Sequence, residues 1–348
     1  MYLSEKIFKR ENCFDFLRFF AAILVIFSHS YPLLGYQKDW LTLRIKSGMS
    51  FGSLAVSIFF IISGFLITAS WYNQKQIIPF LKNRILRLYP ALIFVVLVSF
   101  FIVGPIFSDL SVKDYFLHSG SVEYLWNMTI IKFKSSIPSV FAQNVYKDTF
   151  NGSLWTLRTE LHCYLIVAVL GVLGLFKRKF FWYLWSIPFL IWFFGVSHSN
   201  ELYFVILFLI GQMYYLLKDK IQLNKSIAIL AVVGFAGYLF LSDIHFIIRN
   251  FLLVFSLPYL IFYLAYNLPI LNNFSKYGDF SYGLYIYAFP VQQIVSNLTG
   301  GDLSIKSFFF ISFLITFLCS IFSWYFIEKR ALSLKKISLR KTMGLVSD

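Results

Sequence analysis

The sequence has few charged residues, and acidic residues are scarcest. Of its 348 residues, 14% are charged, and 16 acidic side chains stand against 31 basic ones. A soluble domain carries about a quarter charged residues, so this composition excludes an ordinary soluble domain. Hydrophobic residues make up 59% of the chain and aromatic residues 21%, and the mean hydropathy is +0.72. Most of the chain is therefore expected to face lipid or other apolar helices.

Cysteine and the common cofactor motifs are nearly absent. Cys13, Cys163 and Cys319 are scattered, so they indicate neither a disulfide framework nor a Cys-x-x-Cys metal or redox pair. No GxGxxG, P-loop, HExxH or GxSxG motif occurs, and no spacing of His and carboxylates resembles a metal site. We therefore predict no metal ion and no permanently bound cofactor.

Long apolar runs dominate the chain instead. A search for runs of about 17–25 residues, long enough to cross a bilayer, predicts an all-α polytopic membrane protein with about ten spans. They form one membrane domain over 1–330, followed by a basic tail over 331–348. The polar region 108–152 is expected to hold a short interfacial or re-entrant helix. The predicted spans are 14–34, 51–71, 88–107, 153–175, 180–196, 201–217, 226–242, 246–268, 279–298 and 306–326.

The distribution of basic residues predicts the orientation. With the N-terminus inside, twenty of the 31 Lys and Arg residues fall in cytoplasmic segments, two within spans and nine in outer segments, where Arg249 and Lys306 at the outer ends of their spans are counted as outer. Basic residues concentrate on the cytoplasmic side, so both termini are expected in the cytoplasm and the protein in the inner or plasma membrane. The same placement argues against a nucleic-acid partner, because the charge lies in short joints between apolar runs.

Two polar side chains interrupt the first apolar run. Arg18 and His29 are separated by ten residues, nearly all apolar. Eleven helical steps return close to the starting face, so both project from one stripe, about 16 Å apart along the axis. Such residues are costly in lipid unless they face a protein-lined or water-filled interior. We therefore predict a functional site, with His29 as a proton acceptor; the alternative is a packing histidine and a snorkelling arginine.

A pair of arginines precedes the third predicted span. Arg84 and Arg87 in FLKNRILRLYP are three residues apart and share a helix face. Two guanidinium groups on one face can bind phosphate through several hydrogen bonds, which predicts a site for a phosphate-rich ligand. The alternative is a basic flank that binds anionic lipid headgroups.

The fourth predicted span carries a carboxylate. Glu160 in SLWTLRTEL lies about seven residues, or ~10 Å, inside the span, at a depth similar to that of His29. We expect the two side chains to share a pocket in which Glu160 orients or charges the imidazole. A purely structural hydrogen bond of Glu160 is the alternative. Arg158 should point to the opposite side of the helix.

Other polar or small residues in the spans suggest weaker roles. Gly64 in SIFFIISGFLIT is expected to serve close helix packing. In the ninth span Tyr282, Tyr285 and Tyr287 are expected to anchor the helix at the membrane interface. Candidates for contacting a polar substrate are Tyr164 in the fourth span, Arg249 at a span entrance and Gln292 in the ninth span.

Taken in order, these strings resemble the integral-membrane acyltransferase-3 family, which acylates bacterial surface carbohydrates. The resemblance runs nearly the length of the chain, and its order and spacing make a set of weak strings specific. The strings are Arg18-x10-His29, SIFFIISGFLIT, RILRLYP with Arg84 and Arg87, SLWTLRTE ending at Glu160, SYGLYIYAFP and FIEKRAL.

The resemblance implies a ten-helix acyltransferase that uses cytoplasmic acyl-CoA, usually acetyl-CoA, to O-acylate a sugar. It implies that His29 is the catalytic histidine and that Glu160 lies in the reaction pocket. It also implies that Arg18, Arg84 and Arg87 bind the donor. Expected partners are acyl-CoA as a substrate, a polysaccharide or lipid-linked carbohydrate acceptor, and the bilayer; no sequence feature specifies an oligomeric state.

Two features depart from the family pattern. Ala288 stands where many members have a histidine, which excludes a catalytic role for a second histidine there. Some members also carry a soluble esterase-like domain, which we do not expect because about twenty residues follow the last span. The alternative functions are a transporter or flippase of lipid-linked sugars without acyltransferase activity, and a structural subunit of a polysaccharide assembly complex.

Overall fold

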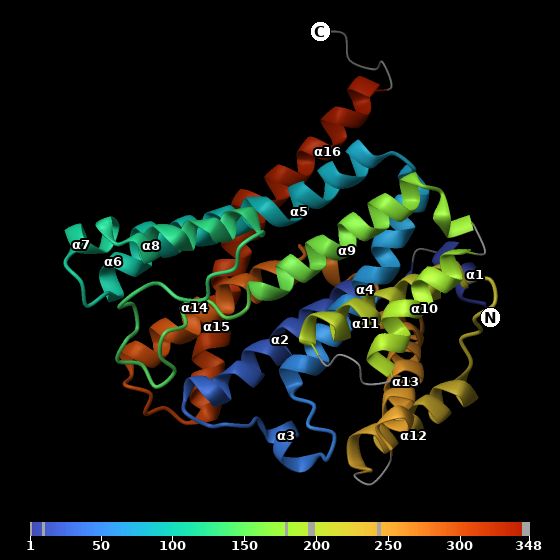
Figure 1. The fold of residues 1–348 in the computed structure, drawn as a ribbon, viewed down its shortest axis with the longest axis horizontal. Helices are drawn as coiled ribbons and strands as arrows, with labels where there is room; N and C mark the ends of the chain where they lie inside the picture. The colour runs from blue at the N-terminus through green and yellow to red at the C-terminus, as the bar shows by residue number, and fades with distance from the viewer. Residues whose placement is uncertain (1, 9–10, 178–179, 194–198, 242–244, 343–348) are drawn as a thin grey trace. The chain divides into compact units, whose positions relative to one another are not determined.

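The protein is helical throughout the part that its computed structural model describes, which is residues 2–8, 11–177, 180–193, 199–241 and 245–342 (Figure 1). Within these ranges the β structure is limited to two isolated bridges. The longer helices are α2 (Phe14–Leu33), α4 (Phe51–Gln74), α5 (Ile77–Val98), α9 (Trp155–Val172), α10 (Phe180–Phe193), α11 (Asn200–Leu216), α12 (Lys225–Phe240), α13 (Phe246–Asn267), α14 (Ser281–Leu298), α15 (Ile305–Ser323) and α16 (Lys329–Thr342).

Short helical pieces connect or extend these helices. A π-helical turn (Ser99–Val103) and α6 (Gly104–Phe107) prolong α5, and a second π-helical turn, η6 (Trp324–Glu328), joins α15 to α16. The others are α1 (Leu3–Phe8), α3 (Trp40–Arg44), α7 (Val112–Leu117), α8 (Ser119–Glu123) and the 3-10 helices η2 (Tyr124–Thr129), η3 (Leu175–Lys177), η4 (Pro269–Leu271) and η5 (Phe274–Lys276).

Each predicted span overlaps a helix, and the chain is a helical membrane protein. The stretches long and apolar enough to cross a bilayer are Phe14–Leu33, Phe51–Gln74, Ile77–Phe107, Phe246–Asn267 and Ile305–Lys335. Two further apolar helices, α11 and α12, are shorter, so a count of ten spans and the orientation stay predictions. Positions 194–196 and 242 of the predicted spans, and 343–348 of the tail, lie outside the described residues.

The helix that contains the third predicted span begins before that span. The span was predicted to start at 88, and α5 begins at Ile77, because the intervening Leu, Lys and Arg residues are strong helix formers despite their charge. Arg84 and Arg87 lie inside this helix, as their expected shared face requires. The polar region after α6 forms α7, α8 and η2 in place of one interfacial helix. Tyr115 of α7 is fully buried, and this burial raises the pKa of its phenol to about 12.

The helices group into two compact units, each assembled from segments far apart in the sequence. Unit 1 comprises 1–25, 38–75 and 162–277, and unit 2 comprises 26–37, 76–161 and 278–348. The boundaries fall inside α2 and α9. Of the predicted site residues, unit 1 holds Arg18, Tyr164 and Arg249, and unit 2 holds His29, Arg84, Arg87, Glu160 and Gln292.

Unit 1 contains a very close crossing of α4 and α11. A Cβ added at Gly64 would lie 1.9 Å from the carbonyl oxygen of Phe208, and one at Gly211 would lie 2.0 Å from that of Ile61. The two helices therefore meet backbone to backbone, which small residues permit in membrane proteins. The packing role predicted for Gly64 is confirmed.

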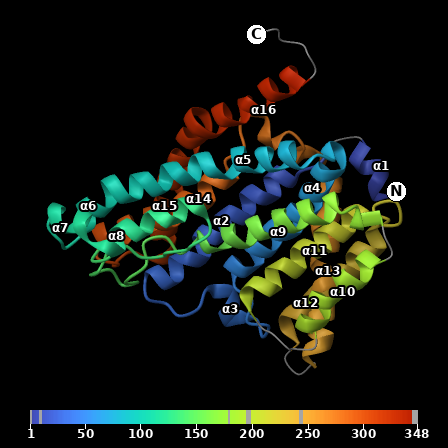
Figure 2. The same ribbon diagram turned by 45° about the horizontal axis from the view of Figure 1, so that its top comes forward.

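Unit 2 is organised around α14, which lies beside α15 in both views (Figures 1 and 2). Fifteen of its 18 residues are buried. The predicted interfacial anchoring of its tyrosines is wrong, because each hydroxyl donates to a buried acceptor inside the unit, as a buried phenol requires. Tyr282 donates to the Leu88 carbonyl at 2.7 Å, Tyr285 to the Ser153 carbonyl at 3.1 Å, and Tyr287 to Ser323 Oγ at 3.2 Å.

Candidate functional site

His29 lies in the second half of α2, against α14. Its ring packs edge-on to the ring of Phe289, with 5.1 Å between centroids. The side chain as a whole is half-buried, and its Nδ1 atom is fully buried without a hydrogen-bond partner. An orphaned ring nitrogen in a protein interior is costly, and a histidine kept in this state is available for proton transfer or nucleophilic attack.

Gln292 of α14 holds the turn of α2 that carries His29. Its Nε2 donates to the Ile26 carbonyl at 2.9 Å and to Ser30 Oγ at 3.1 Å. Ser30 Oγ in turn donates to the Ile26 carbonyl at 2.9 Å. Gln292 is completely buried. We therefore interpret it as a residue that positions His29 by holding the adjacent turn of α2. A direct contact of Gln292 with substrate stays a prediction.

The predicted pairing of Glu160 with His29 is not formed. His29 makes no hydrogen bond or ion pair in the described residues, so the expected pairing with Glu160 is absent. The Glu160 carboxylate interacts electrostatically with the phenols of Tyr282 and Tyr285. It is half-buried, whereas Arg158 is exposed, in agreement with the opposite directions expected from helical periodicity.

Arg87 of α5 meets the start of α14, whereas its neighbour Arg84 contacts Phe80 of its own helix. Arg87 Nη2 donates to Asp279 Oδ2 at 2.5 Å, and the two side chains are 15% and 14% exposed. The other carboxylate oxygen accepts from the Ser281 backbone N–H at 3.2 Å and from its hydroxyl at 2.6 Å. Asp279 thus orients Arg87 and also accepts a hydrogen bond from the first backbone N–H of α14. The Arg84 guanidinium lies over the Phe80 ring, 6.0 Å from its centroid.

The three predicted site residues of unit 1 have separate surroundings. Arg18 lies eleven residues before His29 on α2, which corresponds to about 16 Å along the helix axis. Tyr164 is buried in α9. Arg249 donates to the Ser47 carbonyl at 2.6 Å and lies over the Tyr238 ring, so its guanidinium already has protein partners. Substrate contacts by Tyr164 and Arg249 stay predictions.

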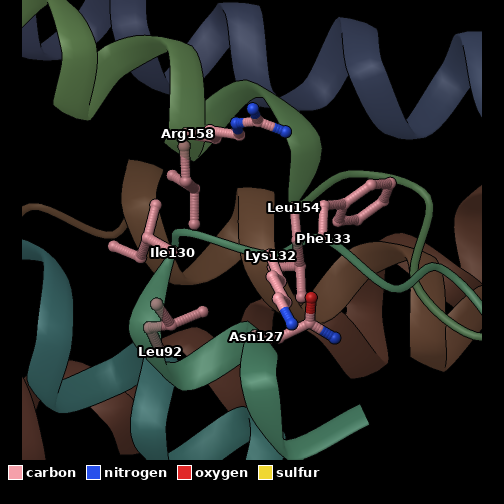
Figure 3. A pocket seen from close by; sticks show the side chains of 8 residues that line it. Leu92, Asn127, Ile130, Lys132, Phe133, Leu154 and Arg158 are labelled. Carbon is pink, nitrogen blue, oxygen red and sulfur yellow. The ribbon is translucent and has the colours of Figure 1, made fainter. Parts of the chain in front are cut away.

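A small pocket opens in unit 2 beside the first turns of α9 (Figure 3). Figure 3 shows the Arg158 guanidinium directed away from the Lys132 ammonium group, so the two cations do not converge on one anion. The Asn127 amide is engaged with the backbone of Lys134 at 2.8 Å. The lining residues are Leu92, Asn127, Ile130, Lys132, Phe133, Leu154, Leu157 and Arg158.

Two buried or half-buried acidic residues of unit 2 were not among the site residues predicted from the sequence. Asp279 is one, and Glu328 is the other; Glu328 is 2% exposed and accepts a hydrogen bond from Ser323 Oγ at 2.9 Å. It lies in the π-helical turn η6, a type of distortion that is frequent at functional sites. The sequence signal that could have identified Glu328 is an acidic residue at the end of an apolar run whose other flanking charges are basic.

The sequence profile of the acyltransferase-3 family, described as an acyltransferase domain, matches residues 11–326. The chain is 31% identical over 352 aligned residues to an O-acetyl transferase of Shigella phage Sf6, covering 95% of this chain and 99% of that protein. No solved structure matches the chain.

Two further relatives each match less than half of the chain. Nodulation protein 10 of Rhizobium leguminosarum bv. viciae is 34% identical over 169 residues, which is 46% of this chain and 44% of that protein. Acyltransferase MdmB of Streptomyces mycarofaciens is 28% identical over 154 residues, 43% of this chain and 36% of that protein. The profile match and the full-length relative confirm the resemblance seen in the sequence: the chain belongs to the acyltransferase-3 family and is an acyltransferase.

Proposed function

We propose that this protein transfers an acetyl group from cytoplasmic acetyl-CoA to a hydroxyl of a cell-surface or lipid-linked carbohydrate. The observation that carries the proposal is His29, an imidazole on a membrane helix whose buried nitrogen has no protein partner. The similarity to a phage O-acetyl transferase over nearly the whole chain supports acetyl as the group transferred.

His29 serves this reaction by one of two routes. As a general base it takes the proton of the sugar hydroxyl while the hydroxyl oxygen attacks the thioester carbonyl, and the CoA thiolate leaves. As a nucleophile it attacks the thioester first, forms an acetyl-imidazole and releases the thiolate. The sugar hydroxyl oxygen then attacks the acetyl carbonyl, the bond from nitrogen to the acetyl carbon breaks, and the hydroxyl proton passes to the departing imidazole. Both routes need the ring in one orientation, which Gln292 supports by holding the adjacent turn of α2.

Arg84 and Arg87 bind the phosphates of the donor in this proposal, and Arg18 is a further proposed donor-binding residue. The support is chemical: guanidinium groups bind phosphate through paired hydrogen bonds, and Asp279 holds Arg87 in place. The length of the pantetheine arm suits the distance from Arg18 to His29 along α2. Glu160 stays a proposed pocket residue, supported by its electrostatic interaction with the phenols of Tyr282 and Tyr285.

The proposed activity is tested by mass spectrometry of surface glycans from cells with the gene intact or deleted. Deletion is expected to remove an acetyl increment from the glycan. Loss of a different increment would retain the enzyme and change the donor. Normal acylation together with a missing surface glycan would contradict the proposal and favour a transporter of lipid-linked sugars.

The donor role of Arg87 predicts two separable effects. Arg87→Ala should lower the free energy of unfolding by about 2 kcal/mol, because the half-buried Asp279 carboxylate loses a charged hydrogen bond. It should also raise the KM for acetyl-CoA at least about tenfold. The double variant Arg87→Ala/Asp279→Asn should recover most of the stability without recovering the KM. Thermal denaturation and initial rates measure the two quantities, and a double variant with normal KM would refute the donor role.

A further inference from the structure

One aromatic ring separates His29 from the loop 144–149, which precedes α9. Phe289 of α14 packs edge-on to His29, with 5.1 Å between ring centroids, and edge-on to Tyr146, with 6.2 Å between centroids. Phe289 is 4% exposed, and a Cβ added at Gly152 would lie 2.9 Å from its ring atom Cε2. The Phe289 ring is therefore tightly packed. All of these residues belong to unit 2.

Buried amides hold the backbone of this loop against α14. Gln293 is completely buried, and its Nε2 donates to the carbonyl oxygens of Tyr146 at 2.9 Å and Thr149 at 2.5 Å. Its Oε1 accepts from Asn144 Nδ2 at 2.7 Å. Asn144 Oδ1 accepts in turn from Asn297 Nδ2 at 2.8 Å. The Gln293 amide thus uses its oxygen and both of its N–H groups within the protein, and it fastens the loop on either side of the Tyr146 ring.

The Tyr146 ring is open although the backbone beneath it is held. Tyr146 is 39% exposed. A tyrosine on a fixed loop offers a large, rigid contact area and has little entropy to lose on binding, because it has only two side-chain torsions. A sugar ring has an apolar face of C–H groups and a rim of hydroxyls. It can therefore stack on such a ring while its rim stays hydrogen-bonded.

An anchor at the membrane interface is the alternative interpretation of Tyr146. Two observations favour contact with a ligand. The Tyr146 ring touches the ring that packs on His29, and its neighbours Lys147 and Asp148 are exposed charges, which need water around this part of the loop. The surroundings of Tyr146 are thus those of a polar substrate near the reactive imidazole.

We propose that Tyr146 is an acceptor-binding residue whose ring stacks on a sugar ring of the carbohydrate acceptor. This inference rests on the proposed function, in which His29 acts on a sugar hydroxyl. Because Phe289 separates the two side chains, Tyr146 contacts the carbohydrate away from the reacting hydroxyl. Its contact is then the same in the ground state and in the transition state, so its loss should raise the KM for the carbohydrate and leave kcat unchanged.

The test measures initial rates of acetyl transfer to glycan purified from the deletion strain, with the full-length protein in nanodiscs. Tyr146→Ala is expected to raise the KM for this glycan about tenfold, or ~1.4 kcal/mol. Its kcat and its KM for acetyl-CoA should stay near those of the wild type. Tyr146→Phe should keep the KM for the glycan, because the ring remains, whereas Tyr146→Leu should resemble Tyr146→Ala.

Trp126→Ala is the matched control for an exposed aromatic residue. Trp126 lies in η2, in the same polar region, and is 49% exposed, with the Lys132 ammonium group 5.0 Å from its ring centroid. Its removal should leave the KM for the glycan unchanged. The midpoint of thermal denaturation should stay near wild type for both variants, as for most surface substitutions. An equal rise in the KM for both variants would overturn the inference and indicate a general effect of interfacial aromatic residues.

The remaining outcomes separate this inference from the proposed function. A wild-type KM for the glycan in Tyr146→Ala would overturn the inference alone, because transfer by the wild type would still establish the enzyme. A rise in the KM for acetyl-CoA in place of that for the glycan would also overturn it and assign Tyr146 to the donor. Failure of the wild type to acetylate glycan from the deletion strain would overturn the proposed function and this inference together.

Discussion

Replacing His29 with alanine is expected to reduce acyl transfer by about 10³-fold while leaving the protein folded. General acid–base catalysis by a positioned side chain contributes about 10²–10⁴-fold, and loss of a nucleophile would cost at least as much. The structural cost should be small, because His29 makes no hydrogen bond among the described residues and its one recorded ring contact is with Phe289. Transfer of labelled acetyl from acetyl-CoA to a carbohydrate acceptor, with the protein in nanodiscs, measures the effect.

His162→Ala is the matched control for this experiment. His162 also lies on an apolar helix, α9, but its side chain is exposed, so its removal should change the rate less than about twofold, as surface substitutions usually change little. Activity of His29→Ala within tenfold of the wild type would show that His29 is not the catalytic base. Unchanged thermal denaturation of the variant would exclude misfolding as the cause of a loss.

The same preparation separates the two chemical routes. Incubation with labelled acetyl-CoA and no acceptor should leave acetyl on His29 if the covalent route operates. Kinetics that require donor and acceptor to be bound together would contradict that route and support direct transfer with His29 as the base. Peptide mass spectrometry after rapid quenching identifies the labelled residue.

Substituting alanine for Gly64 is expected to prevent the packing of α4 on α11. The new Cβ would lie 1.9 Å from the Phe208 carbonyl oxygen and 2.8 Å from the carbonyl carbon. The obstacle is backbone, so no side-chain rotation can relieve the clash, and the helices must separate. We expect a loss of about 3 kcal/mol or more, at the upper end of overpacking penalties. Gly211→Ala should behave alike, since its Cβ would meet the Ile61 carbonyl oxygen at 2.0 Å.

Gly237→Ala provides a control of identical chemistry. Its Cβ would lie 3.4 Å from a methyl group of Leu252, which is ordinary contact with a flexible side chain. The fraction of monodisperse protein after extraction, and the midpoint of thermal denaturation, should fall for Gly64→Ala and stay near wild type for Gly237→Ala. Equal stability of the two variants would show that α4 and α11 do not cross this closely.

The elements that could be predicted from the sequence are those governed by local composition. Each apolar run became a helix, because backbone groups in an apolar segment must find hydrogen bonds within that segment. Gly64 was predicted to pack closely from its place among bulky residues. The helix α5 begins at Ile77, eleven residues before the predicted start of its span at 88, because charge marks the end of an apolar run without ending the helix.

The tyrosines of α14 show where local patterns fail. An aromatic residue near the end of an apolar run has the same appearance whether it faces lipid headgroups or a protein interior. Tyr282, Tyr285 and Tyr287 are buried because acceptors from α5, α15 and the segment before α9 surround α14. Those acceptors are far from α14 in the sequence, so only the packed bundle brings them together.

Motif order, hydropathy and helical periodicity are properties of neighbouring positions, so the family, the helical membrane class and the candidate residues could be identified from the sequence. Which residues meet depends on the packing of the helices. It placed Asp279 on Arg87, and it left His29 without the carboxylate expected from Glu160. Matched depth along two helices constrains one coordinate, whereas a contact also depends on how each helix is rotated and which helices are neighbours, and packing alone settles both.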